Sequence, residues 1–375
     1  MSSHPIVVIG AGLSGSAAAW KLSAAGRDVV VLERDEPASP FGSSHGSARI
    51  FRYAYPDPFY TDLVRIARAG WDELEASLGT TLITPSGALD FGGRRDPAAL
   101  ASVLGELDIA HELLAPSEAA DRWPGFAFDG PVLWHEAAGV IDAESAVNGM
   151  LRLAEAHGAV VHSNWTANSV LKRGDGYVVV SETGAEQPAS QVVVAAGGWL
   201  PSLLGSLDLP DDIVFPAVEV RQEQALHFPY RDPEAAWPTF IHKTDDLQVY
   251  GLPGGRDADF CGQKVAIYNG GRVIPSALGH DRVVDPAQRE RLVDYVARTL
   301  PGLNPEPYAE TTCLFTNLPE EEFVIDRVEG VTILSPCSGH GAKFAPLIGE
   351  LAARLVTGGD DVPARFRPLH AKVPA

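Results

Sequence analysis

The feature that most constrains this chain of 375 residues is its N-terminal stretch, from Ile6 to Glu33. An apolar run leads into Gly10, Gly12 and Gly15 in Gly-x-Gly-x-x-Gly spacing, then into apolar residues at helical spacing, then into a second apolar run. This order predicts a strand, a tight turn, a helix and a second strand. Glycines there let the backbone approach a pyrophosphate, and the start of the helix directs free N–H groups at phosphate. The stretch therefore predicts a dinucleotide site, with Glu33 placed to accept hydrogen bonds from the adenosine ribose, but it does not say which dinucleotide binds.

Charge and cysteine content exclude several other classes of protein. A net charge of −20 disfavours nucleic acid and anionic membranes as partners. No apolar stretch approaches the ~18 to 20 residues of a membrane span, and no leader pattern opens the chain, so we expect a cytoplasmic protein. Cys261, Cys313 and Cys337 form no Cys-x-x-Cys pair, so we expect no disulfide framework and mostly buried thiols. The pair His135-Glu136 is followed by Gly139 where a zinc protease would have its second His, and no metal site is expected.

A loop of small residues follows the dinucleotide unit. It runs from Gly42 to Gly46, with Ser43, Ser44 and His45 between them, and Arg49 and Arg52 come next. Loops at the carboxyl ends of such strands are where ligands bind. Both arginines fall among aromatic and aliphatic residues, which predicts partial burial. A buried arginine needs a carboxylate, phosphate or flavin-type partner.

The rest of the chain alternates between two kinds of pattern. The α/β rhythm returns at Asp142, and Val192 to Trp199 is typical of a buried strand that ends in small residues, which permit close approach to a second part of the dinucleotide. Residues from about 216 to 304 predict a separate β-rich layer. Cys337 to Phe344 then join a strand to a helix through Gly-x-Gly, which favours an anion at the helix start. The tail after Gly358 is expected to be loosely ordered.

One lysine is ambiguous on pattern alone. Lys264 lies in the β-rich layer, just before an apolar run. A lysine within a strand more often faces outward, so the local pattern by itself predicts an exposed structural residue.

Together these features resemble the family of monomeric sarcosine oxidase and N-methyltryptophan oxidase, within the FAD-dependent amino-acid oxidases. The resemblance covers nearly the whole chain. It rests on five groups of residues: Gly10, Gly12 and Gly15 with Glu33; Gly42 to Gly46 with Arg49 and Arg52; Ala196, Gly197 and Trp199; Lys264; and Cys313 with Ser338 to Phe344. It implies an α/β and α+β fold, with a discontinuous Rossmann-type FAD-binding domain and a β-rich substrate domain. The expected FAD-binding segments are 1–85, 140–215 and 308–375, and the substrate domain is expected over 86–139 and 216–307.

The resemblance also implies how the cofactor is held. FAD is expected to be attached covalently to the Cys313 sulfur through its 8α-methyl group, with His45 and Arg49 against the flavin in catalytic roles. Cys261 and Cys337 are expected to be packing cysteines. The remaining cofactor contacts implied are Gly10, Gly12, Gly15, Glu33, Ser43, Ser44, Ala196, Trp199, Gly339, His340, Gly341 and Lys343.

The implied substrate is a small amino acid with a secondary amine. Arg52 and Lys343 would hold its carboxylate, and Tyr250 and Tyr268 would line its pocket. The implied reaction is hydride transfer from the carbon α to the neutral amine onto flavin N5, followed by hydrolysis of the imine, with no strong side-chain base. By resemblance, Lys264 assists electron transfer to O2, which yields hydrogen peroxide. The expected partners are thus the amino acid and O2, and the expected state is a monomer.

Three departures from the family pattern leave the substrate open. Tyr268 stands where a His is common, Ser47 and Ala48 replace Asp and Thr, and the loop Gly254 to Asp259 looks longer. The substrate could be sarcosine, a cyclic imino acid, a larger N-alkyl amino acid or a specialised biosynthetic intermediate. Other readings are a non-covalent FAD oxidase of primary amino acids and a flavoprotein dehydrogenase with a protein or quinone acceptor. An NAD-dependent dehydrogenase would leave Cys313 and the second glycine-rich segment unexplained.

Overall fold

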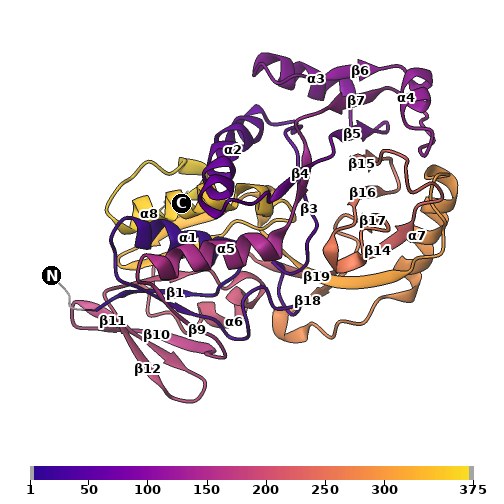
Figure 1. Cartoon of the computed structure of the whole chain (residues 1–375). Coiled ribbons are helices and arrows are strands. Elements are labelled where there is room, and N and C mark those ends of the chain that lie inside the picture. The colour runs from indigo at the N-terminus through magenta and orange to yellow at the C-terminus, as the bar shows by residue number, and fades with distance from the viewer. Residues whose placement is uncertain (1–3, 371–375) are drawn as a thin grey trace.

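The structure is a computed structural model that describes residues 4–370. One half of it is built on a largely parallel sheet (Figure 1). This sheet has six strands, in the order β20 (Val324–Val328), β21 (Val331–Ser335), β13 (Gln191–Val194), β1 (Ile6–Ile9), β2 (Val29–Leu32) and β9 (Val160–His162). All neighbours pair in parallel except β20, which is an antiparallel edge strand. The strand, helix and strand predicted at the N-terminus are confirmed as its centre.

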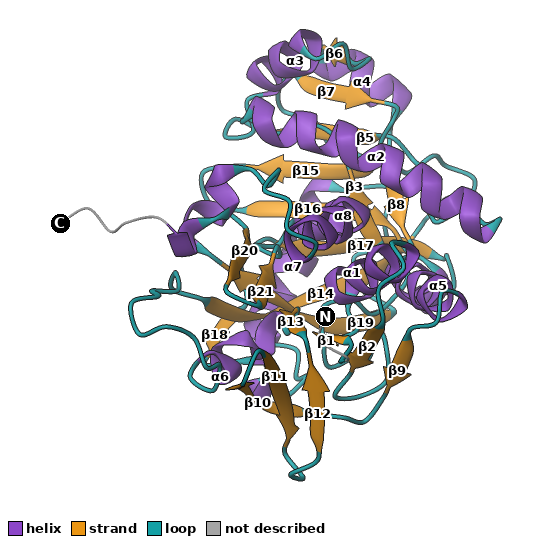
Figure 2. Ribbon diagram, turned by 90° about the vertical axis from the view of Figure 1, so that its left-hand side faces the viewer, coloured by secondary structure: helices purple, strands orange, loops and turns teal. Residues whose placement is uncertain are grey.

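Both faces of this sheet are covered, as parallel sheets require. Helices lie against one face and a small antiparallel sheet against the other (Figure 2). The helices are α1 (Leu13–Ala24), α5 (Ala143–Ala156) and α8 (Ala345–Val356), with α2 (Pro58–Leu78) packed on α8. The small sheet consists of β10 (Ala167–Arg173), β11 (Gly176–Ser181) and β12 (Glu186–Ala189).

The other half is a nine-stranded sheet made from two distant parts of the chain. Its order is β18 (Arg272–Ile274), β14 (Glu219–Pro229), β17 (Gly262–Ile267), β16 (Gln248–Pro253), β15 (Thr239–Lys243), β5 (Ala88–Phe91), β7 (Val132–His135) and β6 (Glu112–Leu114), with β19 (Ala309–Asn317) paired to β14. The parallel pairing of β15 with β5 joins the two parts. The predicted α/β and α+β fold is confirmed, while the exact domain boundaries stay a prediction.

Shorter elements connect the two halves. A three-stranded sheet, in the order β3 (Arg49–Phe51), β8 (Gly139–Ile141) and β4 (Ile83–Pro85), carries the first of the predicted arginines. The remaining α-helices are α3 (Pro97–Glu106), α4 (Pro116–Arg122), α6 (Leu200–Leu204) and α7 (Pro286–Thr299). Leu292, Tyr295 and Val296 of α7 pack on the large sheet.

The helix ends follow from local sequence. Asp57 caps α2 by accepting a hydrogen bond of 2.9 Å from Phe59 N, and Pro58 occupies the first turn. The same helix ends at Gly79, whose φ of 64° is the left-handed conformation that glycine adopts without strain. Asp285 and Pro286 start α7 in the same way.

The C-terminal tail is better packed than its sequence indicates. Phe366 is fully buried, with its ring against those of Phe59, Tyr60 and Phe323. The prediction of a loosely ordered tail after Gly358 is therefore wrong up to residue 370, and its last part, 371–375, lies outside the described residues. The residues next to Phe366 in the sequence do not indicate this packing, because the aromatic residues that it contacts are distant in the chain.

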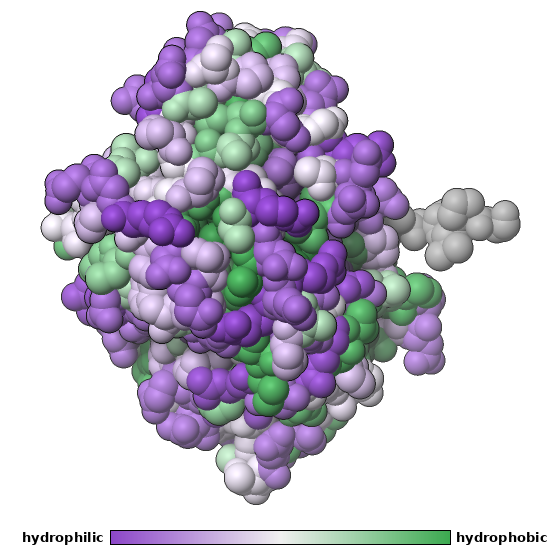
Figure 3. Space-filling model, turned by 90° about the vertical axis from the view of Figure 1, so that its right-hand side faces the viewer, coloured by the Kyte–Doolittle hydropathy of each residue, from purple (hydrophilic) through white to green (hydrophobic). Residues whose placement is uncertain are grey.

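Within residues 4–370, no helix combines the length and the apolar character needed to cross a membrane. Hydrophilic residues cover most of the face in Figure 3, and apolar residues appear there in separate patches.

Candidate active site

A cavity of about 580 Å³ lies where the two halves meet, and it runs from the glycine turn to the segment before α8. It brings together nearly all the site residues predicted from the sequence. Those that line it are Gly10, Gly12, Glu33, Ser43, Ser44, Arg49, Arg52, Ala196, Trp199, Tyr250, Lys264, Tyr268, Cys313, Gly339, His340, Gly341 and Lys343. Gly15 and His45 are not part of its wall.

The glycine turn leaves the start of α1 open to the cavity. Gly10 has a φ of 96°, and a Cβ on Gly15 would lie 1.8 Å from the Gly10 carbonyl oxygen, so neither position tolerates a side chain. Gly15 therefore acts behind the wall, where it lets α1 pack on the turn. Ser44 Oγ accepts a hydrogen bond of 3.0 Å from Leu13 N. The bare backbone at this helix start fits a pyrophosphate.

Glu33 lies beside the turn, at the end of β2. Its Oε2 accepts a hydrogen bond of 2.6 Å from Ala11 N, and its Oε1 accepts one of 3.0 Å from Asp35 N. Burial raises the pKa of Glu33, and the two backbone hydrogen bonds oppose that rise. A fixed acceptor next to the helix start fits a ribose hydroxyl, so this end of the cavity suits the adenosine part of FAD.

Arg49 organises the small-residue loop. Its guanidinium donates hydrogen bonds to the carbonyl oxygens of Ser43 at 2.8 Å, His45 at 2.9 Å and Ala48 at 2.9 Å. Ser43 Oγ in turn donates to Leu314 O at 2.7 Å, which ties the loop to β19. The loop therefore presents a fixed positive charge in the cavity wall.

His45 stands behind that wall, in a smaller hollow shared with His227 and Asp257. Its Nε2 is buried and has no hydrogen-bond partner within the described chain. Burial, and then the charges of Arg49 and Lys264, lower the pKa of His45 to about 3. The imidazole is therefore neutral at physiological pH.

The three thiols have different surroundings. Cys313 on β19 and Cys337 are half-buried and both line the cavity. Burial raises the pKa of Cys313, while Arg49 and Lys264 oppose the rise. Cys261 is exposed, so the expectation of a buried packing residue is wrong for it. It follows a turn in which Asp259 and Phe260 have positive φ values of 51° and 55°, and this turn carries the thiol to the surface.

At the opposite end of the cavity, Lys343 and Arg52 lie around Tyr55. Lys343 Nζ donates hydrogen bonds to Tyr55 Oη at 2.9 Å and to His340 O at 2.6 Å. Tyr55 Oη lies 3.0 Å from His340 Nδ1, and the Arg52 guanidinium stacks 4.5 Å above the Tyr55 ring and donates to Ala54 O. Burial and then Arg52 lower the pKa of Lys343 well below its usual value. The sequence analysis did not identify Tyr55 as a site residue, because the local pattern shows it only as an aromatic neighbour of Arg52.

Lys264 faces the cavity and does not face solvent. It is only 7% exposed, because β17 is buried along its whole length between β14 and β16. The outward orientation predicted from the pattern alone is therefore wrong. Burial, followed by Arg49, lowers the pKa of Lys264 to about 8, and Cys313 and Asp257 oppose this shift. No hydrogen bond joins its Nζ to another described residue.

Two departures from the family pattern meet near Lys264. Ser47 Oγ donates a hydrogen bond to Asp257 Oδ1, and Asp257 N donates one of 3.0 Å back to Ser47 Oγ. Burial by itself would raise the pKa of Asp257, but the hydrogen bond from Ser47 and the charge of Lys264 bring it below its usual range. At position 47 the family pattern has an aspartate, whereas this chain has Ser47. The loop Gly254 to Asp259 supplies a carboxylate beside that position, that of Asp257.

The two tyrosines differ in how they are held. Tyr268 Oη donates a hydrogen bond of 3.1 Å to Ser338 O, and its ring packs 5.6 Å from that of Phe315. Tyr250 on β16 lines the cavity wall, and burial raises its pKa.

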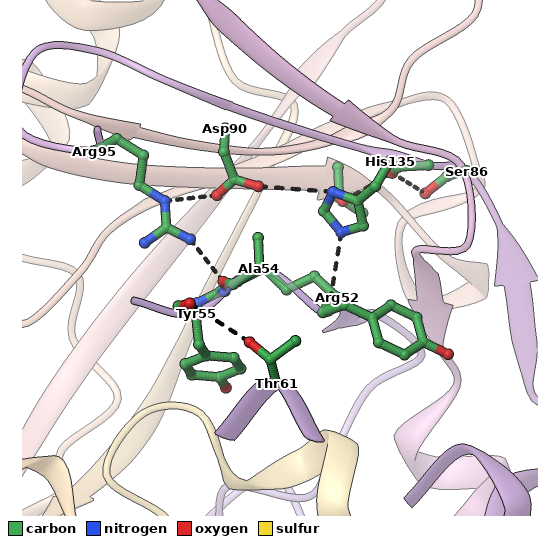
Figure 4. A network of polar contacts seen from close by, with 11 residues as sticks. Arg52, Ala54, Tyr55, Thr61, Ser86, Asp90, Arg95 and His135 are labelled. Atoms are coloured by element: carbon green, nitrogen blue, oxygen red, sulfur yellow. Dashed lines mark hydrogen bonds and ion pairs between the residues drawn. The ribbon is translucent and has the colours of Figure 1, made fainter. Parts of the chain in front are cut away.

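A buried polar network supports the segment that carries Arg52 and Tyr55 (Figure 4). Arg95 Nε donates to Asp90 Oδ1 at 2.6 Å, and a terminal nitrogen of Arg95 donates to Ala54 O at 2.9 Å. His135 Nε2 accepts a hydrogen bond of 3.4 Å from Tyr53 N, and its Nδ1 lies 3.9 Å from Asp90 Oδ2. Burial lowers the pKa of His135 to about 4. The sequence gives no local sign of this network.

Comparison with known proteins identifies the family of the chain. The family described as FAD dependent oxidoreductase matches residues 5–355. The chain is 34% identical over 368 residues to monomeric sarcosine oxidase of Streptomyces avermitilis, which spans 95% of this chain and 94% of that protein. It is 30% identical over 363 residues to N-methyl-L-tryptophan oxidase of Yersinia pestis, with 93% and 94% covered. The solved structure of NikD, an unusual amino acid oxidase essential for nikkomycin biosynthesis, matches with a TM-score of 0.87 at 22% identity, covering 100% of this chain and 99% of that chain. The protein is thus an enzyme that belongs to the family of FAD-dependent oxidoreductases.

Proposed function

We propose that the protein is an FAD-dependent oxidase of an amino acid with a secondary amine, and that it reduces O2 to hydrogen peroxide. The observation that carries the proposal is the presence in one cavity of two cations suited to a carboxylate, Arg52 and Lys343, and a third buried cation, Lys264. The similarity to sarcosine and N-methyltryptophan oxidases supports a secondary amine.

The residues along the cavity suggest how FAD is held. The start of α1 and Glu33 would take the pyrophosphate and the ribose, and Ser43, Ala196 and Trp199 line the path toward Cys313. We propose that Cys313 forms the covalent link. Arg49 and Lys264 supply the positive charge that favours a thiolate there. When bound, FAD supplies the two-electron oxidation of the carbon–nitrogen bond.

The chain's own residues would bind and orient the substrate. Arg52 offers paired N–H donors to a carboxylate, and Lys343 offers a point charge on the same side. Tyr55 and His340 hold the Lys343 ammonium in place through the hydrogen bonds described above. Tyr250 and Tyr268 would limit the space around the amine. This arrangement contributes orientation and electrostatics, so a strong side-chain base is not needed if the amine is bound neutral.

Lys264 would assist the second half of the cycle. A buried ammonium stabilises negative charge as it develops on O2, because the low local dielectric strengthens the interaction. We further propose that the enzyme acts as a monomer in the cytoplasm, on a small-molecule substrate and O2.

The test separates reduction from reoxidation. The flavin-loaded enzyme is mixed anaerobically with N-methyl, cyclic and primary amino acids, and flavin bleaching is followed. O2 is then admitted and hydrogen peroxide, ammonia and amine products are measured. We expect bleaching by N-methyl or cyclic amino acids and peroxide in step with substrate consumed. Ammonia release from primary amino acids alone would support an oxidase of primary amines instead, and bleaching without peroxide would support a dehydrogenase.

A further inference from the structure

A third lysine lies at the substrate end of the cavity and has no role in the function proposed above. Lys243 is the last residue of β15, and it lines the cavity together with Ile241, Gln248 and Tyr268. Its Nζ lies 5.9 Å from the centre of the Tyr268 ring. Arg52 and Lys343, which would take the substrate's α-carboxylate, come from two other segments of the chain.

Within residues 4–370, the one contact that the structure shows for the Lys243 ammonium is that with the Tyr268 ring. No ion pair or hydrogen bond joins its Nζ to another residue of the described chain. The carboxylates that act on it are Glu321 and Asp90. Asp90 is already bound to Arg95, and Glu321 is an exposed residue at the cavity wall.

Its surroundings are unfavourable for a cation that lacks an anion. Lys243 is half-buried, and burial, followed by the charges of Arg95 and Arg52, lowers its pKa to about 8. Keeping a partly desolvated ammonium next to two guanidinium groups costs free energy unless an anion compensates it. An anionic group of a ligand beside Lys243 would offset this cost by neutralising the ammonium charge.

The neighbouring strand offers a second donor. Gln248 pairs with Lys243 in the register of β15 and β16, and this residue also lines the cavity. A carboxylate between these two side chains could accept one charged and one neutral hydrogen bond. Arg95 also lines the cavity, but its Nε and one terminal nitrogen are already bonded to Asp90 and Ala54, so its main contribution to the subsite is its charge.

We propose that Lys243, with Gln248, forms a subsite for a second anionic group of the substrate. The substrate is then a dicarboxylate: an N-substituted amino acid that carries one carboxylate at Arg52 and Lys343 and another at Lys243. N-carboxymethyl amino acids and N-methyl derivatives of acidic amino acids have this chemistry. The inference rests on the proposed function and narrows its substrate class.

Binding of two matched ligands tests the subsite without turnover. Methylthioacetate and thiodiacetate carry sulfur in place of the amine, and they differ in that thiodiacetate has the second carboxylate. Their affinities for the flavin-loaded enzyme are measured by titration calorimetry. We expect thiodiacetate to bind at least about tenfold more tightly, which corresponds to about 1.4 kcal/mol. Lys243→Met should remove that preference, and Lys243→Arg should keep most of it.

The control variant is Lys172→Met, because Lys172 is an exposed lysine on β10 that pairs with Glu329. It removes one charge from the protein and should leave the preference for thiodiacetate unchanged. Equal affinities in the unaltered enzyme, or equal weakening of both ligands by Lys243→Met, would overturn the subsite.

The proposed function can fail separately. A preference for thiodiacetate that depends on Lys243, with no flavin bleaching by any secondary amino acid, would overturn the oxidase proposal and leave the anion subsite standing. If N-methyl monocarboxylates bleach the flavin and thiodiacetate binds no more tightly than methylthioacetate, the subsite is overturned and the oxidase proposal stands. Absence of binding by both ligands would overturn the subsite and would contradict the carboxylate site at Arg52 and Lys343.

Discussion

The Lys343 ammonium donates a hydrogen bond of 2.9 Å to the Tyr55 hydroxyl, across 288 positions of sequence. This contact joins the segment after β3 to the turn before α8, and it lies at the cavity end where Arg52 stacks on the same tyrosine ring. Tyr55 thus positions both cations proposed to hold the substrate carboxylate.

Tyr55→Phe should weaken substrate binding by about tenfold, because a hydrogen bond to a charged group contributes about 1.5 kcal/mol. The ring remains, so the Arg52 stacking is retained and the loss comes from the Lys343 contact. The effect should appear in KM and in the affinity for a carboxylate inhibitor, both measured with flavin-loaded enzyme. An unchanged affinity would show that the His340 carbonyl alone holds Lys343 in place.

Cys313→Ser should release the flavin on acid precipitation, whereas the unaltered protein should retain it. Cys337→Ser is the matched control, because Cys337 is also a half-buried thiol in the same cavity wall. Absorbance of the pellet and of the supernatant measures the partition. Retention of flavin by Cys313→Ser together with its release from Cys337→Ser would assign the bond to the other thiol. Free FAD from the unaltered protein would rule out a covalent link.

Lys264→Met should slow reoxidation by O2 by about 100-fold, the range found when one preorganised electrostatic donor is removed. Reduction by substrate should change much less. The charged form of Lys264 exists below its pKa of about 8, so the reoxidation rate should fall as the pH rises through about 8. Stopped-flow mixing of anaerobically reduced enzyme with O2 measures both effects. If the reoxidation rate of Lys264→Met depended on pH in the same way as that of the unaltered enzyme, the titrating group would be a residue other than Lys264.

Asp90→Asn should lower the free energy of unfolding by about 3 kcal/mol, because it leaves the buried Arg95 charge without its counter-ion. Asp90 and Arg95 side chains are 0% and 3% exposed, so solvent does not compensate for the loss. Urea unfolding of the flavin-loaded protein measures the change. The double variant Asp90→Leu with Arg95→Met should recover part of the stability, since it removes both charges. Additive losses in the double variant would mean that the two side chains do not act as a pair.

Features of the site that depend on local backbone geometry could be predicted from the sequence. The turn at Gly10 and the start of α1 depend on neighbouring residues alone, and the structure has them where the pattern placed them. The family resemblance brought in residues that no local pattern identifies, such as Lys264 and Cys313. Their place in the cavity wall agrees with that expectation, and their chemical roles stay predictions.

The sequence by itself thus determined the strand, turn, helix and strand at the N-terminus, and the set of charged residues available for chemistry. Tertiary structure alone decided which of these residues face one another. Lys264 is buried because strands β14 and β16 flank β17 in a covered sheet, which the residues around it do not encode. Tyr55 with Lys343, Asp90 with Arg95 near His135, and Lys243 beside Arg52 depend on the folding of distant segments onto each other. Burial then sets their pKa values, because desolvation depends on the whole surrounding structure and not on the neighbouring residues in the chain.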